Sequence, residues 1–189
     1  MKLMNVLSEI ESVKTIKDVN WYGLLSSARK TWKHELNNNV KIPEKFYDYI
    51  GSLLMSFTSN MKETFESDVM RGNLSKNTLD LFNSNVLSSL NEISKDPNLN
   101  SEIQNIPSYQ RKLAKTVGAG KIKNGVDKAV QMTGQKFFKE GFTTPLKSYY
   151  STNSPIVQNY IKVSVQMGDS ISNNQQLKTQ LYNFIMNKL

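Results

Sequence analysis

Lysine and arginine side chains dominate the chemistry that this sequence can perform. Residues 108–147 contain nine of them against two acidic residues, a net charge of +7. The phosphates of a nucleic-acid backbone would supply the missing counter-charge, and such binding weakens steeply with salt. The alternative is a solvated cationic face that only keeps the chain in solution. The candidates for phosphate contact are Arg111, Lys112, Lys115, Lys121, Lys123, Lys128, Lys136, Lys139 and Lys147.

Spacing places two pairs of these cations on shared helix faces. Arg111 and Lys115 are four residues apart, and Lys136 and Lys139 are three apart, so each pair projects from one side of a helix. The sequence contains no zinc-finger spacing, basic zipper or RNA-binding strand motif, so we predict backbone contacts without base readout. A second, weaker basic cluster near the N-terminus consists of Arg29, Lys30 and Lys33.

The inventory of reactive residues argues against an enzyme. The chain has no cysteine and one histidine, His34, whose neighbour Glu35 points to a different helix face and cannot orient it. Residues 118–121 match only part of a phosphate-binding loop, because no Ser or Thr follows the lysine. The paired carboxylates of Glu63 and Glu66 lack the partners of a carboxylate metal site. We therefore expect no catalytic residue, metal, cofactor or small-molecule substrate.

Charge is distributed unevenly along the 189 residues. Residues 1–103 hold twelve Lys and Arg against thirteen acidic residues, whereas residues 104–189 hold twelve against three, a net charge of +9. Such asymmetry points to a polyanionic partner, either nucleic acid or an acidic membrane surface. We expect a near-neutral N-terminal helical arm with further helices at 1–100, and a basic helical bundle region at 101–189.

The apolar spacing is helical nearly throughout, and no segment alternates long enough for a strand, so we predict an all-α protein. Residues 98–107 are expected to form a connector, Gly141 to end a helix, and Pro145 to begin the next one. The predicted helices run over 3–13, 21–36, 43–69, 75–95, 109–117 after a Ser108 cap, 121 or 124 to 140, 145–150, 155–167, and 170 or 174 to 189.

Aromatic residues provide a further indication. Phe137 and Phe138 are neighbours, as are Tyr149 and Tyr150. Adjacent side chains point to different faces of a helix, so burying both requires a subunit interface beside the core. The alternative is one buried ring and one ring on the surface. Trp32 shares an apolar stripe with the neighbouring helical residues, so we expect it in the core.

The segment 141–167, GFTTPLKSYYSTNSPIVQNYIKVSVQM, resembles a pattern in the major coat proteins of filamentous and rod-shaped archaeal viruses, of the lipothrixvirus and rudivirus type. The preceding helix at 117–134, rich in small and basic residues, is also similar in character. The shared features are a Leu-Lys-x-Tyr-Tyr motif, a short proline-containing linker and an aliphatic helix, formed here by Leu146, Lys147, Tyr149, Tyr150, Pro155, Ile156 and Ile161.

This resemblance implies a helical-bundle core with an N-terminal helical arm. Coat subunits of this family pair as dimers and wrap double-stranded DNA, held in A-form, into a helical nucleoprotein filament; in the enveloped members two paralogous subunits form a heterodimer. The expected partners are therefore the DNA backbone, a second copy or a paralogous coat subunit, and filament neighbours. The expected location is the virion, and the host cytoplasm before assembly.

Together, these patterns predict a structural virion protein that coats double-stranded DNA without sequence preference. The virion and the filament are implied by the resemblance, whereas the polyanionic partner is inferred from the distribution of charge. The alternative is a helical scaffold or adaptor, such as an internal virion component, whose basic half binds an acidic protein partner. A DNA ligand predicts affinity that falls steeply with salt, and a protein partner predicts a shallower dependence.

Overall fold

The computed structural model describes residues 15–39 and 60–189, and helices form most of this part of the chain. No strand occurs in these ranges, so the prediction of an all-α helical bundle is confirmed. The elements are η1 (Ile16–Asp18), α2 (Trp21–Asn39), α4 (Lys62–Arg71), α5 (Lys76–Ser94), α6 (Pro97–Gln104), α7 (Ser108–Thr116), α8 (Ala119–Met132), the π-helical η3 (Thr133–Lys139), α9 (Glu140–Tyr149), α10 (Pro155–Ser172) and α11 (Gln175–Lys188).

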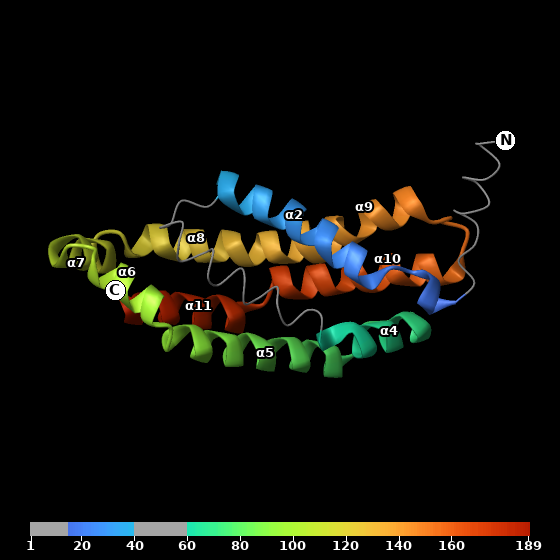
Figure 1. Ribbon diagram of the computed structural model, residues 1–189, viewed down its shortest axis with the longest axis horizontal. Helices are drawn as coiled ribbons and strands as arrows, with labels where there is room; N and C mark the ends of the chain where they lie inside the picture. Colours follow the sequence, from blue (N-terminus) through green and yellow to red (C-terminus); the bar gives the residue numbers. More distant parts are fainter. Residues whose placement is uncertain (1–14, 40–59) are drawn as a thin grey trace.

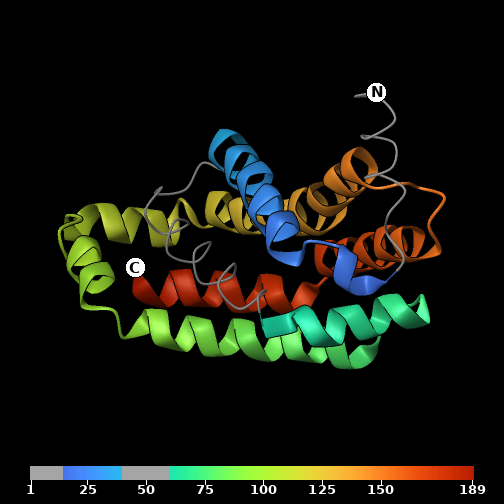
Figure 2. The same ribbon diagram turned by 45° about the vertical axis from the view of Figure 1, so that its right-hand side comes forward.

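The helices form an elongated bundle (Figure 1). α8, η3 and α9 follow one another directly as one long helical unit, and α10 and α11 run back beside it, with a bend at Asn173 and Asn174. α2 crosses one side of this pair, over η3 and α9, and α4 and α5 cover the other side (Figure 2). α6 and α7 lie at the end of the bundle where α8 begins.

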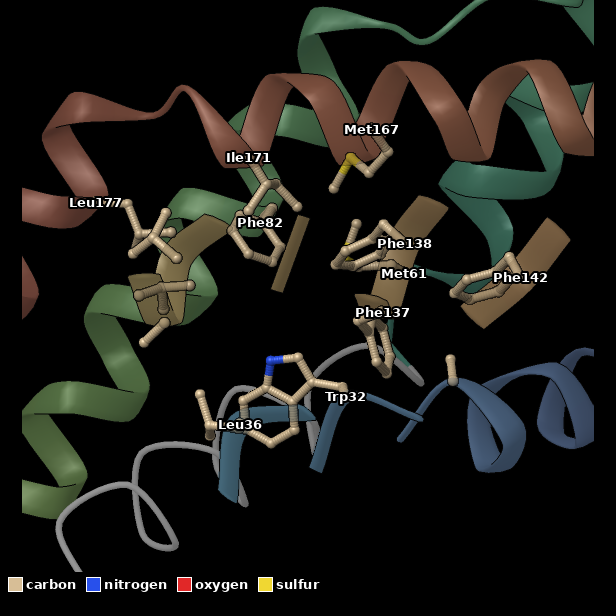
Figure 3. Packing of buried hydrophobic residues seen from close by; sticks show 14 of the residues in the cluster. Trp32, Leu36, Met61, Phe82, Phe137, Phe138, Phe142, Met167, Ile171 and Leu177 are labelled. Carbon is tan, nitrogen blue, oxygen red and sulfur yellow. The ribbon is translucent and has the colours of Figure 1, made fainter. Parts of the chain in front are cut away.

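The π-helical segment η3 buries two adjacent phenylalanines within one chain. Phe137 and Phe138 are each 1% exposed, and their ring centroids lie 4.7 Å apart. A π-helical turn takes in one extra residue, which places neighbouring side chains closer together around the helix than in an α-helix. Phe82 of α5 and Phe142 of α9 pack against the pair (Figure 3). Neither alternative stated for this pair is correct, because both rings are buried without a second subunit.

The buried residues form one core that both halves of the sequence share. Trp32 is 4% exposed, and its Nε1 donates a hydrogen bond to Thr133 Oγ1 at 2.9 Å, so its expected place in the core is confirmed. The cluster of buried apolar residues extends from Val19, just before α2, to Ile185 in α11. The division into 1–100 and 101–189 therefore describes the distribution of charge, whereas the hydrophobic core contains residues from both segments.

Capping groups fix several helix ends where the sequence predicts them. Ser75 Oγ accepts a hydrogen bond from the N–H of Thr78 at 3.2 Å, and the Ser154 and Asn174 side chains cap α10 and α11 in the same way. Gly72 ends α4 with a left-handed φ of 78°, which glycine adopts without strain. The predicted helix at 3–13 and the first part of the one at 43–69 lie outside the described residues.

Three predictions about the segment from 97 to 120 are wrong. The expected connector contains α6, because the Asp96 carboxylate accepts from the N–H of Asn98 and Pro97 occupies the first position of the helix. Ser108 is the first residue of α7 rather than its cap, a position that Pro107 holds. The break before α8 is shorter than expected, since the helix already starts at Ala119.

The predicted helix end at Gly141 and helix start at Pro145 are also wrong. The helix continues through both residues, and Pro145 lies inside α9. Gly141 is buried where α2 crosses, and a Cβ added there would lie 2.8 Å from the Cα of Ala28. The glycine is therefore needed for the close approach of two helices and does not act as a stop signal.

Candidate nucleic-acid interface

The twelve cations that the sequence predicts as a binding site lie on α2 and on the helices from α7 to α9. Nine of them are exposed, and Arg111, Lys136 and Lys139 are half-buried. By element, α2 carries Arg29, Lys30 and Lys33, α7 carries Arg111, Lys112 and Lys115, α8 carries Lys121, Lys123 and Lys128, η3 carries Lys136 and Lys139, and α9 carries Lys147.

Charge differs between the two sides of the bundle. The segment 108–149, from α7 to α9, has a net charge of +7, and α2 adds three cations against Glu35. The segment 62–104, from α4 to α6, holds four Lys and Arg against seven acidic residues, a net charge of −3. Figure 1 shows α2, α8 and α9 along one long side and α4 and α5 along the opposite one. We call the side formed by α2, α8, η3 and α9 the basic layer.

Within the described residues, Lys136 and Lys139 have counter-charges. Lys136 Nζ lies 2.6 Å from Glu140 Oε2, and this hydrogen bond, with the charges of Glu140 and Glu35, raises the pKa of Lys136. Lys139 Nζ lies 3.2 Å from Asp169 Oδ1 on α10. The expectation that the basic stretch lacks internal counter-charge is therefore wrong for these two lysines, which are the least suited of the set to hold phosphate.

The lysines of α8 occupy two flanks of its exposed face. Lys121 and Lys128 are seven residues apart, two helical turns, and so share one flank. Lys123 lies on the other flank, four residues before Asp127. One polyanion lying along α8 would therefore contact Lys121 and Lys128 together.

A cleft in the basic layer brings Lys30 near the tyrosine pair. Its volume is about 540 Å³, and α2 and α9 form its walls. Tyr150 is half-buried, and its Oη accepts a hydrogen bond from the backbone N–H of Asn20 at 2.9 Å, whereas Tyr149 is 69% exposed. This pair thus follows the alternative of one packed ring and one surface ring. The lining residues are Asn20, Gly23, Leu24, Ser26, Ser27, Lys30, Pro145, Tyr149 and Tyr150.

An apolar stripe on α7 is the feature that sequence reasoning missed. Tyr109, Leu113 and Val117 are 66%, 57% and 82% exposed and follow one another at intervals of four residues, so they share one face. No residue of α7 is buried. The spacing is visible in the sequence, but only the position of α7 at the end of the bundle reveals that this face is uncovered.

Residues 15–39 and 60–189 contain neither a metal-binding cluster nor a candidate membrane span. No three His, Asp or Glu side chains gather there as ligands for a metal ion, and every helix in these ranges is too short or too polar to span a bilayer. His34 is exposed, and its Nε2 lies 3.2 Å from Nδ2 of the Asn38 side chain.

The fold and the site define an all-α bundle with a cationic side, a cleft with both polar and apolar lining within that side, and an uncovered apolar stripe at one end. Neither a protein-family model nor a curated protein nor a solved structure matches the chain.

Proposed function

We propose that this protein is a structural virion subunit that coats double-stranded DNA without sequence preference. The basic layer is the observation that carries this proposal. Exposed cations gathered on one side repel one another, and a polyanion with closely spaced charges relieves this repulsion. Phosphate contacts of this kind carry no sequence information. The resemblance of residues 141–167 to archaeal viral coat proteins supports the same function.

In this function the protein acts by charge and repetition rather than by catalysis. Each subunit neutralises a few phosphates, and neighbouring subunits on the same duplex add their contacts, so that many weak interactions give a stable filament. The half-buried Lys136 and Lys139 form ion pairs with carboxylates of the bundle, and we expect them to contribute to its stability more than to DNA binding. The cations expected to contact phosphate are Arg29, Lys30, Lys33, Lys112, Lys115, Lys121, Lys128 and Lys147.

Binding to a random-sequence duplex is expected to weaken steeply with salt. If each subunit neutralises about four to six phosphates, log K falls with a slope of about −4 to −5 against log salt concentration. Changing Lys121→Glu together with Lys128→Glu removes two contacts, so we expect a slope shallower by about two and at least about tenfold weaker binding at low salt. Fluorescence anisotropy across a salt series, with electron microscopy of the mixtures, measures both the affinity and the filaments.

The matched control for this pair is Lys76→Glu together with Lys95→Glu. Lys76 is the first residue of α5 and Lys95 directly follows its last; both are exposed on the opposite side of the bundle, and the control has the same change in net charge. We expect it to bind DNA nearly as the wild type does. Equal losses from the two pairs would show that net charge, and not the basic layer, sets binding. A shallow salt slope would favour an acidic protein as the partner.

The contact between copies in the proposed filament is expected at the apolar stripe of α7. Such a stripe of large exposed side chains is typical of an interaction surface. Arg111 and Lys115 project from the opposite side of α7, so two stripes can pair without bringing these cations together. Burial of paired stripes would therefore stabilise a symmetric contact between two copies.

Changing Leu113→Asp is expected to weaken this self-association at least about tenfold, because it places a charge in the centre of the stripe. Sedimentation velocity over a concentration series measures the effect. Leu87→Asp is the matched control, since Leu87 is an exposed leucine of α5, 45% accessible, and we expect it to leave association unchanged. A wild type that stays monomeric at every concentration, or equal effects of both changes, would contradict the assignment of the stripe.

A further inference from the structure

We infer that the cleft between α2 and α9 binds one phosphodiester of the DNA backbone and the sugar beside it. This inference rests on the proposed function and adds to it a particular site. The basic layer alone requires only diffuse attraction, whereas a formed cleft can hold a defined chemical group in one place.

The side chains that line the cleft are of the kinds that contact phosphate and sugar. Lysine, serine, asparagine and tyrosine donors make such contacts in protein–DNA complexes, and here they are Lys30, Ser26, Ser27, Asn20, Tyr149 and Tyr150. In the part of the chain that the structure describes, no carboxylate lines the cleft, so none of these nine side chains repels an anion. Leu24 and Pro145 provide apolar surface for the carbon atoms of a deoxyribose.

The charge and the size of the cleft suit one nucleotide unit. Among the described residues that line the cleft, Lys30 is the one cation, and a phosphodiester carries one negative charge, whereas a phosphate monoester carries between about 1.5 and 2. The volume of about 540 Å³ lies within the range of sites that hold small molecules, of about 300 to 1,000 Å³. A flat lysine-rich surface would have neither a defined volume nor a single charge to match one nucleotide unit.

Hydrogen bonds hold the walls of the cleft in place before any ligand binds. The N–H of Gly23 donates to Asn20 Oδ1 at 3.0 Å, and the N–H of Asn20 donates to Tyr150 Oη at 2.9 Å. Because the Tyr150 oxygen accepts this bond, its own hydrogen remains to be donated to an anion. The start of α2 borders the same cleft, and the positive end of the helix dipole favours negative charge there.

The test is a double-mutant cycle on binding to a short random-sequence duplex, about one helical turn longer than a subunit's footprint, by fluorescence anisotropy at low salt. Lys30→Gln is expected to weaken binding about tenfold and to make the salt slope shallower by about one. Tyr149→Ala is expected to weaken binding about threefold with an unchanged slope, because the contact of a hydroxyl and a ring is not ionic. If both contact the same nucleotide, Tyr149→Ala loses most of its effect in the Lys30→Gln background.

The control residues lie on α2, the helix that carries Lys30. Lys33 and Tyr22 are exposed on α2, Tyr22 at 63%, and neither lines the cleft. We expect Tyr22→Ala to leave binding unchanged, and Tyr149→Ala to keep its full effect in the Lys33→Gln background. Wild-type binding with a steep salt slope, but with Lys30→Gln and Tyr149→Ala additive, would overturn the cleft and leave the proposed function standing. A wild type that does not bind the duplex would overturn both.

Discussion

Changing Gly134→Ala is expected to destabilise the bundle by about 3 kcal/mol or more, a large effect for the addition of one methyl group. A Cβ added at Gly134 would lie 2.1 Å from Ser172 Oγ and 2.3 Å from the backbone carbonyl oxygen of Gly168. The serine can rotate away, but the carbonyl belongs to α10 and moves only with that helix. The expected result is a separation of η3 from α10, or a chain that does not fold.

Gly168, on α10, is the second glycine at the contact between η3 and α10, and an alanine there would also clash with the facing helix. A Cβ added at Gly168 would lie 2.5 Å from the carbonyl oxygen of Gly134. The two helices therefore touch backbone to backbone, at the place where Phe138 and Met167 enter the core beside them (Figure 3). Moving the helices apart would open voids around these side chains, and such voids cost free energy beyond the clash itself.

Urea unfolding followed by circular dichroism measures the change in the free energy of unfolding. Gly120→Ala is the matched control, because Gly120 is exposed on α8 and an added Cβ would meet no atom within 4 Å beyond the local backbone of its own helix. Alanine is the better helix former, so we expect this control to stabilise the protein by up to about 1 kcal/mol. A Gly134→Ala protein as stable as the wild type would show that η3 and α10 lie farther apart than the structure places them.

The sequence predicts the helices and their caps because those signals are local. Ser75, Ser154 and Asn174 each cap a helix through an N–H only three residues away, and Gly72 needs only its own backbone conformation. The π-helical segment could not be predicted in this way. It is favoured by the burial of Phe137 and Phe138 against distant helices, and no local pattern specifies those contacts.

Glycine and proline signals failed where tertiary packing overrides them. Gly141 reads as a helix end in the sequence, but the approach of α2 to within contact of its backbone is the reason for the glycine. Pro145 reads as a helix start, but α9 tolerates it within a helix that is held on both sides by neighbours. Both errors come from contacts between residues that are far apart in the chain.

The candidate site was predictable by residue type and not by arrangement. Clustered charge identifies the cations, but the pairing of Lys139 with Asp169 depends on how η3 packs on α10. The cleft is harder still to foresee, since Ser26 and Ser27 carry no signal of their own and become part of a site only when α9 lies beside α2. The side of the bundle on which the charges gather is likewise a property of the fold.

Changing Asp68→Ala is expected to cost about 3 to 5 kcal/mol, the range for breaking a buried charged network by removing one partner. Asp68 is fully buried at the end of α4. Its Oδ2 accepts hydrogen bonds from Thr78 Oγ1 at 2.6 Å and from the N–H of Ser75 at 2.9 Å, and its Oδ1 pairs with Arg71. Without the carboxylate these donors lose their acceptor, and the start of α5 loses its attachment to α4.

The same carboxylate predicts how stability depends on pH. Burial by itself raises the pKa of Asp68, but the hydrogen bonds from Thr78, Ser75 and Arg71 outweigh it, so the pKa in the folded protein lies below the usual 3.8. A carboxyl group with a lowered folded pKa contributes stability that is fully present above its unfolded pKa and is lost as the pH falls through the folded value. The contribution of Asp68 is therefore complete at pH 7 and shrinks below about pH 4.

Unfolding in urea at about pH 7 and about pH 3 tests both statements, with Asp68→Asn added as a variant of similar size that carries no charge. We expect the stability difference between the wild type and Asp68→Asn to be smaller at the lower pH, because protons bind the Asp68 carboxyl of the unfolded chain more readily than that of the folded protein, and this lowers the stability of the wild type alone. Asp80→Asn is the matched control, since Asp80 is exposed on α5 and its replacement should change stability by less than about 0.5 kcal/mol. A stability difference for Asp68→Asn that is equal at both pH values would mean that the side chain acts through shape and neutral hydrogen bonds, and that its charge does not hold α4 to α5.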